Sequence, residues 1–127
     1  MNQSQRPVKM RAAALDRMEE TKEVWIGLLG IKPLPGNDLL SPGALGAYVQ
    51  TLAWASSQNE YLAEIGKALK DYGFSLEEYN DLEPIAVRSR KMQLEDPILK
   101  LASEVRATKN VRFGIFNNYF DDGSKPS

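Results

Sequence analysis

The sequence contains no cysteine and no histidine among its 127 residues. The absence of cysteine excludes disulfides and thiolate metal sites. The absence of histidine removes the commonest general base and the usual zinc ligand. Serine-nucleophile motifs and a Gly-x-x-x-x-Gly-Lys phosphate loop are missing as well. We therefore predict that the protein is not an enzyme, and that it has no catalytic residues, no cofactor and no metal site.

Long hydrophobic runs and a strong net charge are also missing. No run of 18 apolar residues occurs, so we expect no segment to cross a membrane. The polar, basic N-terminus lacks the apolar region of a secretory signal, which favours a cytoplasmic protein. The formal net charge of −1 predicts no general attraction to nucleic acid or to an anionic membrane. The length fits one domain, predicted over residues 7–120, with flexible ends at 1–6 and 121–127.

The strongest pattern that is present is a helical one between Ser41 and Gly73. Ser41 is a good N-cap, Pro42 suits the first turn, and Gly73 is placed to end a helix in the left-handed conformation. Apolar residues recur between them every three or four positions. These residues are Leu45, Tyr48, Val49, Leu52, Ala55, Leu62, Ile65 and Leu69. We predict one long central helix over residues 41–73.

The segments on either side of this central helix also carry helix signals. Pro7 can begin a helix that ends at about Leu29, and the last turns of that helix are apolar on nearly all sides, which indicates burial on more than one side. Its apolar face consists of Ala14, Leu15, Met18, Trp25, Leu28 and Leu29. Further along, Ser75 and Glu78 form a capping box that predicts a helix from Leu76.

Two prolines divide the rest of the helical region. Pro84 predicts a break or a kink, after which a helical segment continues to about Leu94. Asp96-Pro97 is a cap-then-proline signature and predicts a helix that ends at about Lys109. Together these segments predict an all-α fold, a compact single-domain bundle of about five helices.

Residues 111–120 fit two patterns. Val111, Phe113 and Ile115 alternate like a strand, whereas the phenylalanines also fit helical spacing. A lone strand would have no partner in a helical chain, because its edges must pair with something. We therefore expect helix or irregular structure packed on the bundle.

Charge divides the chain more clearly than any motif. Residues 61–83 contain six acidic and two basic side chains, a net charge of −4, whereas residues 84–112 contain seven basic and three acidic side chains, a net charge of +4. Three interpretations are open. The two halves face each other inside the fold, they meet across a homodimer or a partner protein, or the basic half binds phosphate groups.

The acidic half supplies the candidate binding surface, a cluster of carboxylates with one aromatic neighbour. Its members are Glu77, Glu78, Tyr79, Asp81 and Glu83. Tyrosine is enriched at protein interfaces, so its presence favours a protein partner. By elimination we predict a non-catalytic protein-binding module, such as an adaptor, an inhibitor or an immunity-type protein. Frequent small residues in 41–73 would also permit close contact between two copies, so a homodimer is possible.

The alternative hypothesis is binding of nucleic acid through the basic half. The candidate residues are Arg88, Arg90, Lys91, Arg106, Lys109 and Arg112. No helix-turn-helix pattern accompanies them, so nucleic acid ranks second as a partner. Salt dependence would separate the two hypotheses, because binding to phosphates weakens steeply as salt rises.

Overall fold

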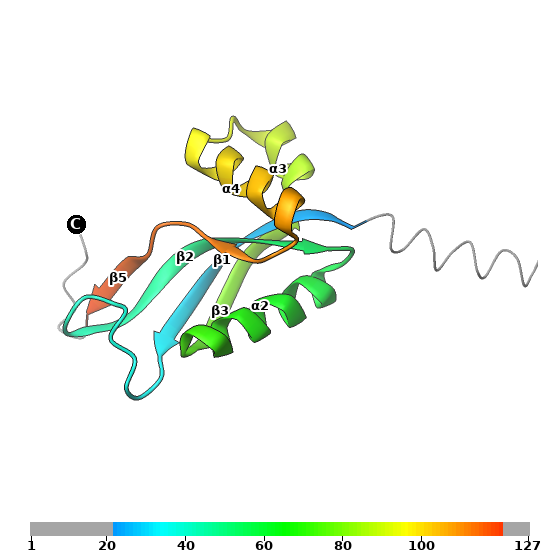
Figure 1. Ribbon diagram of the computed structural model, residues 1–127. Helices are drawn as coiled ribbons and strands as arrows, with labels where there is room; N and C mark the ends of the chain where they lie inside the picture. Colours follow the sequence, from blue (N-terminus) through cyan, green and yellow to red (C-terminus); the bar gives the residue numbers. More distant parts are fainter. Residues whose placement is uncertain (1–21, 121–127) are drawn as a thin grey trace, which may run out of the picture.

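The computed structural model describes residues 22–120. An antiparallel sheet forms the middle layer of this region, with helix α2 against one face and helices α3 and α4 against the other (Figure 1). The elements, in chain order, are β1 (Glu23–Pro33), β2 (Ala44–Ala55), α2 (Gln58–Tyr72), β3 (Phe74–Pro84), α3 (Ile85–Lys91), α4 (Asp96–Thr108), β4 (Arg112–Phe113) and β5 (Asn117–Phe120).

The two long strands β1 and β2 form the centre of the sheet. They pair antiparallel from Glu23 opposite Ala55 to Ile31 opposite Ala47. Strand β3 pairs antiparallel with the other side of β1 and forms one edge. The short strands β4 and β5 both pair antiparallel with β2 and form the opposite edge.

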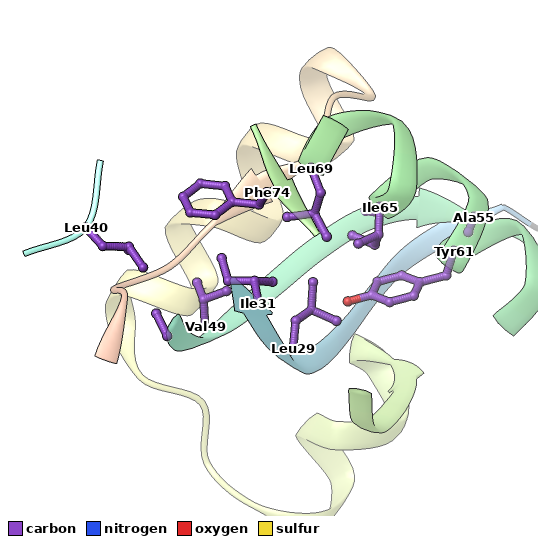
Figure 2. Close-up of a cluster of buried hydrophobic side chains, with 11 residues drawn as sticks. Leu29, Ile31, Leu40, Val49, Ala55, Tyr61, Ile65, Leu69 and Phe74 are labelled. Carbon is purple, nitrogen blue, oxygen red and sulfur yellow. The ribbon is translucent and has the colours of Figure 1, made fainter. Parts of the chain in front are cut away.

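The larger core lies between the sheet and α2. Tyr61, Ile65 and Leu69 recur at four-residue spacing on α2 and are fully buried. They meet side chains of the central strands, including Leu29 and Val49 (Figure 2). The Tyr61 hydroxyl donates a 2.8 Å hydrogen bond to the Thr51 carbonyl oxygen, which satisfies the polar tip of this buried ring.

The smaller core lies on the opposite face, under α3 and α4. It brings together side chains from two strands and two helices: Val24, Ile26, Leu52, Ile85, Ala102 and Val105. All of them are at least 95% buried. This core occupies only the end of the sheet at which β1 begins, so no helix of residues 22–120 covers the rest of that face (Figure 1).

The prediction of an all-α bundle of about five helices is wrong, and residues 23–33 show why. Apolar residues there alternate between two covered faces: Ile26 packs under α4, whereas Leu29 packs against α2. A strand that is buried on both faces is apolar on all sides, as is a buried helix, and periodicity alone does not separate them. The β-branched Val24, Ile26 and Ile31 favoured the strand.

The predicted helix over 41–73 is also wrong in its first half. Residues 44–55 form β2, and α2 begins only after Ser57. The Ser57 side chain accepts a 3.1 Å hydrogen bond from the Glu60 backbone N–H, and the Glu60 carboxylate accepts hydrogen bonds from the Ser56 backbone N–H and hydroxyl. The predicted end is confirmed: Gly73 caps α2 with a left-handed φ of 81°.

The capping box at Ser75 and Glu78 does not begin a helix, because these residues lie in β3. The Ser75 hydroxyl instead donates a 2.9 Å hydrogen bond to the Glu77 carboxylate. Local capping signals stabilise a helix by about 1 kcal/mol. Pairing with β1 instead gives this segment backbone hydrogen bonds along its length. Tertiary pairing therefore overrides the local preference.

The helices after Pro84 are confirmed, with small differences at their ends. Helix α3 follows Pro84 directly and ends at Lys91, before the predicted Leu94. Helix α4 begins at Asp96 and has Pro97 in its first turn, as predicted. Lys109 ends α4 in the left-handed conformation, with φ of 62°.

The expectation for residues 111–120 is wrong, because β4 and β5 are strands. Phe113 lies opposite Thr51 and Tyr119 lies opposite Gly46, so β2 supplies the partner that the all-α prediction lacked. No helix within residues 22–120 is long and apolar enough to cross a membrane. The helix predicted to begin at Pro7 and the ends predicted to be flexible lie mostly or wholly outside the described residues.

Candidate functional site

The structure places the five predicted binding residues along the edge strand β3 rather than on a helical turn. Glu77, Glu78, Tyr79 and Asp81 are exposed, and 45% of Tyr79 is accessible to solvent. No ion pair to Glu77, Glu78 or Asp81 is present between residues 22 and 120. This edge of the sheet therefore carries uncompensated negative charge.

Glu83, the fifth candidate, has a different role because its carboxylate is used inside the fold. Lys91 Nζ lies 2.6 Å from it, and Arg88 Nε contacts its other oxygen. Hydrogen bonds from Lys91 and then from Arg88 hold the pKa of Glu83 below its usual value. Arg88 also donates a 2.8 Å hydrogen bond to the Asp81 carbonyl oxygen. The cluster ties α3 to the end of β3.

Two bulges make β3 a poor template for another strand. Between Ile26 and Leu28 of β1, the β3 partner moves from Glu83 to Asn80, so one β3 residue is extra. A second shift follows at Gly30. Within the first bulge, Asp81 has a φ of 57°, in the left-handed region. Bulges and acidic side chains are the usual protection of an exposed edge against pairing, so we expect side chains, rather than backbone pairing, to contact a partner here.

The part of the sheet beside this edge that α3 and α4 leave uncovered presents two tyrosines. The Tyr48 hydroxyl donates a 2.7 Å hydrogen bond to the Glu78 carboxylate, and its ring centroid lies 5.4 Å from that of Tyr119. Glycines make this arrangement possible, because a side chain at Gly30 would meet Tyr48 and Glu78, and one at Gly46 would meet Tyr119. We call Tyr48, Glu78 and the half-buried Tyr119, together with the exposed Glu77 and Asp81 of the adjacent edge, the acidic tyrosine surface. Tyr79 lies opposite Leu29, which packs against α2, so its ring is on the other side of the sheet.

The carboxylate of Glu78 also sets the chemistry of Tyr48. The hydrogen bond and the negative charge of Glu78 raise the pKa of the Tyr48 hydroxyl above its usual value. Tyr48 therefore stays a neutral hydrogen-bond donor throughout the physiological range. Its ring is 36% exposed, so it offers an aromatic face whose polar end is already satisfied.

The structure does not bring the six predicted nucleic-acid-binding residues together as free cations. Arg88 and Lys91 bind Glu83, and Arg112 Nε lies 3.3 Å from the Glu104 carboxylate. Lys109 Nζ lies 3.9 Å from the Trp54 ring centroid. Within the described part of the chain, no carboxylate or ring contact engages the remaining two, Arg90 and Arg106.

Tyr48 was not predicted as part of this surface, because it fitted the helical spacing of the predicted central helix. A signal for its true position was present: Tyr48 and Gln50 alternate with the buried Ala47 and Val49, which is the period of a half-covered strand. The position of Tyr119 beside Tyr48 depends on the pairing of β5 with β2.

Comparisons with known proteins give no relative from which a function can be transferred. No protein-family model matches the chain, and neither a curated protein nor a solved structure matches it.

Proposed function

We propose that the protein is a non-catalytic binding module for another protein, and that the acidic tyrosine surface is where the partner docks. The observation that carries the proposal is that Tyr48 and Tyr119 lie beside carboxylates that have no ion-pair partner among residues 22–120. Tyrosine contributes large contact area with few rotatable bonds, and it is enriched among the residues that dominate interface energetics.

The charge of this surface indicates the chemistry of the partner. Glu77, Glu78 and Asp81 lie along one short strand, and no cation of the described region neutralises them. A partner with a basic surface would neutralise these carboxylates. The complementary potential would also raise the association rate and orient the two proteins. An adaptor, an inhibitor of a basic protein or an immunity-type protein would fit this description. A cytoplasmic location is part of the same proposal.

Nucleic acid is the weaker alternative. Four of the six candidate cations have an intramolecular partner, so phosphate binding would have to compete with existing contacts. The remaining pair, Arg90 and Arg106, is small compared with the 6–10 phosphate contacts of a typical strong binder. In a homodimer, the second copy would need to present a basic face to the acidic edge of the first.

A pull-down from a native cell extract tests the proposal with charge-matched variants. The full chain is compared with the double variant Glu77→Lys/Asp81→Lys. The control, Glu64→Lys/Asp71→Lys, makes the same charge change on α2, which covers the other face of the sheet. We expect one protein to be retained by the wild type and by the control, and to be lost with the β3 variant. Equal retention by all three proteins would contradict the proposed surface.

A binding titration with fluorescent single-stranded oligonucleotides tests the alternative that the protein binds nucleic acid. We expect no saturable binding at roughly physiological salt, because four of the six candidate basic side chains already have a partner within residues 22–120. Saturable binding that weakens steeply between about 50 and 200 mM salt and is lost in Arg90→Ala/Arg106→Ala would favour the nucleic-acid function instead.

A further inference from the structure

A groove lies between α4 and the segment that joins β4 to β5. Its volume is about 570 Å³, and its floor and walls include Gln50 of β2, Ile98 and Leu101 of α4, and Phe113 and Ile115 of the joining segment. Most of these side chains are apolar. The groove is separate from the acidic tyrosine surface, because none of the residues that define that surface lines it.

Two features of the groove are unusual for a surface that stays in contact with water. Ile115 is 78% exposed, the largest exposure among the large hydrophobic side chains of the described region. The Gln50 side-chain oxygen is shielded from solvent and has no hydrogen-bond partner within residues 22–120. A shielded acceptor without a donor destabilises the folded state. Both features would be explained by a segment that covers the groove and offers a donor.

The first 21 residues of the chain are long enough to be that segment. The described chain begins at Lys22, whose Nζ lies 3.1 Å from the Glu60 carboxylate, and Glu23 lies opposite Ala55. Gln50 lies five positions along β2 from Ala55, about 17 Å at ~3.3 Å per residue. A helix over residues 7–18 would be about 18 Å long, and residues 19–21 would add up to about 10 Å of extended link.

The composition of this segment suits the groove. Val8, Ala12, Leu15 and Met18 recur at helical spacing and would form one apolar face. Residues 16–20 contain Asp16, Glu19 and Glu20 against a single arginine, whereas residues 6–11 contain three basic residues and no acidic one. The acidic part therefore lies nearer to the described chain, and the basic part lies further from it.

The charged side chains that line the groove are Glu95, Lys100 and Glu104. Glu95 lies at the N-terminal end of α4, whereas Val105 near the other end packs in the same core as Val24, close to where the described chain begins. A segment that runs back along the groove from Lys22 would thus bring its basic part to Glu95. Glu104 already has a partner, because Arg112 Nε lies 3.3 Å from its carboxylate.

We propose that residues 7–18 of the chain dock in this groove of the same molecule, with Leu15 and Met18 against Ile98, Leu101 and Ile115. The bound segment extends the smaller core and covers the groove between α4 and residues 113–117. The inference does not depend on the proposed function, because it concerns a different surface. It adds a means of control, since a partner that competed for the groove would release the N-terminal segment.

Paramagnetic relaxation in the full chain tests the docking directly. The sequence has no cysteine, so a nitroxide attached to Ala13→Cys is the single label. We expect the amide signals of Gln50, Gly114 and Ile115 to lose most of their intensity, and those of Lys70 on α2 to keep it. Unchanged groove signals, or an equal loss over the whole molecule, would overturn the proposal.

A mixing experiment identifies which copy supplies the segment. Isotope-labelled protein without a nitroxide is mixed with unlabelled protein that carries it. Intramolecular docking predicts no signal loss at the groove in this mixture. Loss at Gly114 and Ile115 in the mixture would overturn the proposal in favour of docking between two copies.

Limited proteolysis of groove variants gives an independent readout. Trypsin can cleave after Lys9, Arg11 and Arg17, and docking should slow this cleavage. In Ile115→Glu we expect cleavage about tenfold faster, because it follows the population of the undocked state. Ile115 is so exposed that this variant should fold. The control Leu39→Glu changes an exposed leucine before β2 and should leave the rate unchanged. Equal cleavage in all three proteins would overturn the proposal.

Discussion

The two faces of the sheet are built differently. On one face, α2 presents Tyr61, Ile65 and Leu69 to strand residues that are almost fully buried. On the other, α3 and α4 cover only the end where Val24 and Leu52 lie. The first face is a continuous core that supplies stability, whereas residues 22–120 leave a tyrosine-bearing half and an apolar groove uncovered on the second face. Substitutions on the two faces should therefore affect different properties.

The largest expected effect is on the closed face. Ile65→Ala should lower the free energy of unfolding by about 3 kcal/mol, because it removes a fully buried aliphatic side chain and leaves a cavity. Tyr48→Ala on the open face should cost less than half as much, since its ring is partly solvated. Urea denaturation of both variants measures the difference. Equal losses would show that the open face is as much a part of the core as the closed one.

Glycine substitutions test how closely the sheet elements approach each other. At Gly46 an added methyl group would collide with the Ile31 backbone oxygen and with Tyr119, so Gly46→Ala should destabilise by about 2 kcal/mol. Gly66 lies in α2 with open space around it, and Gly66→Ala should stabilise by up to about 1 kcal/mol. Thermal melting of the two variants should give shifts of opposite sign, and a stabilising Gly46→Ala would contradict the packing of β5 on β2.

A smaller effect is expected from the two tyrosine hydroxyls. Tyr61→Phe removes a buried hydrogen bond to the Thr51 carbonyl oxygen and should cost about 1–2 kcal/mol. Tyr48→Phe removes an exposed hydrogen bond to Glu78 and should cost clearly less, because solvent can replace that bond. Urea denaturation again measures both values. A larger loss for Tyr48→Phe would mean that the open face stabilises the fold more than its exposure indicates.

The smallest effect is expected from pH. Hydrogen bonds from Ser56 lower the pKa of Glu60, and those from Lys91 and Arg88 lower the pKa of Glu83. A carboxylate whose pKa is lower in the folded state stabilises the protein above its unfolded-state pKa, and this contribution is lost as pH falls through the folded-state pKa. Stability should therefore fall below about pH 4.5, near the ordinary glutamate value.

Two charge-neutral variants test the origin of this pH dependence. Both Glu83→Gln and Glu60→Gln should flatten the acidic limb of the stability curve, as measured by urea denaturation from neutral to acidic pH. Glu78→Gln on the open face is the control. An unchanged acidic limb in both test variants would show that other carboxylates cause the loss.

Local signals predicted the helices that depend on local contacts. Asp96-Pro97 marked the start of α4, and Gly73 marked the end of α2, because a proline in the first turn and a left-handed glycine act through the backbone around them. Ser57 and Glu60 carried an equally good start signal for α2, and it was overlooked in favour of Ser41. These features need no distant partner.

The candidate site was predicted only in part, because its residues come from segments that are distant in the chain. The acidic residues from Glu77 to Asp81 are exposed, but the helical turn on which they were placed is an edge strand with two bulges. Tyr48 and Tyr119 are far from these residues in the chain. The pairing of the strands brings them close, so that Tyr48 contacts Glu78 and Tyr119 lies beside Tyr48. No periodicity within a short window contains that information.

Composition and local backbone chemistry were sufficient to locate α3 and α4, to end α2 and to exclude thiol and imidazole chemistry. Pairing between distant segments decided the rest: that residues 23–33, 44–55 and 74–84 are strands, and that one face of the sheet stays partly open. The physical reason is that a helix satisfies its hydrogen bonds within its own segment, whereas a strand obtains them from neighbours that only the folded chain supplies.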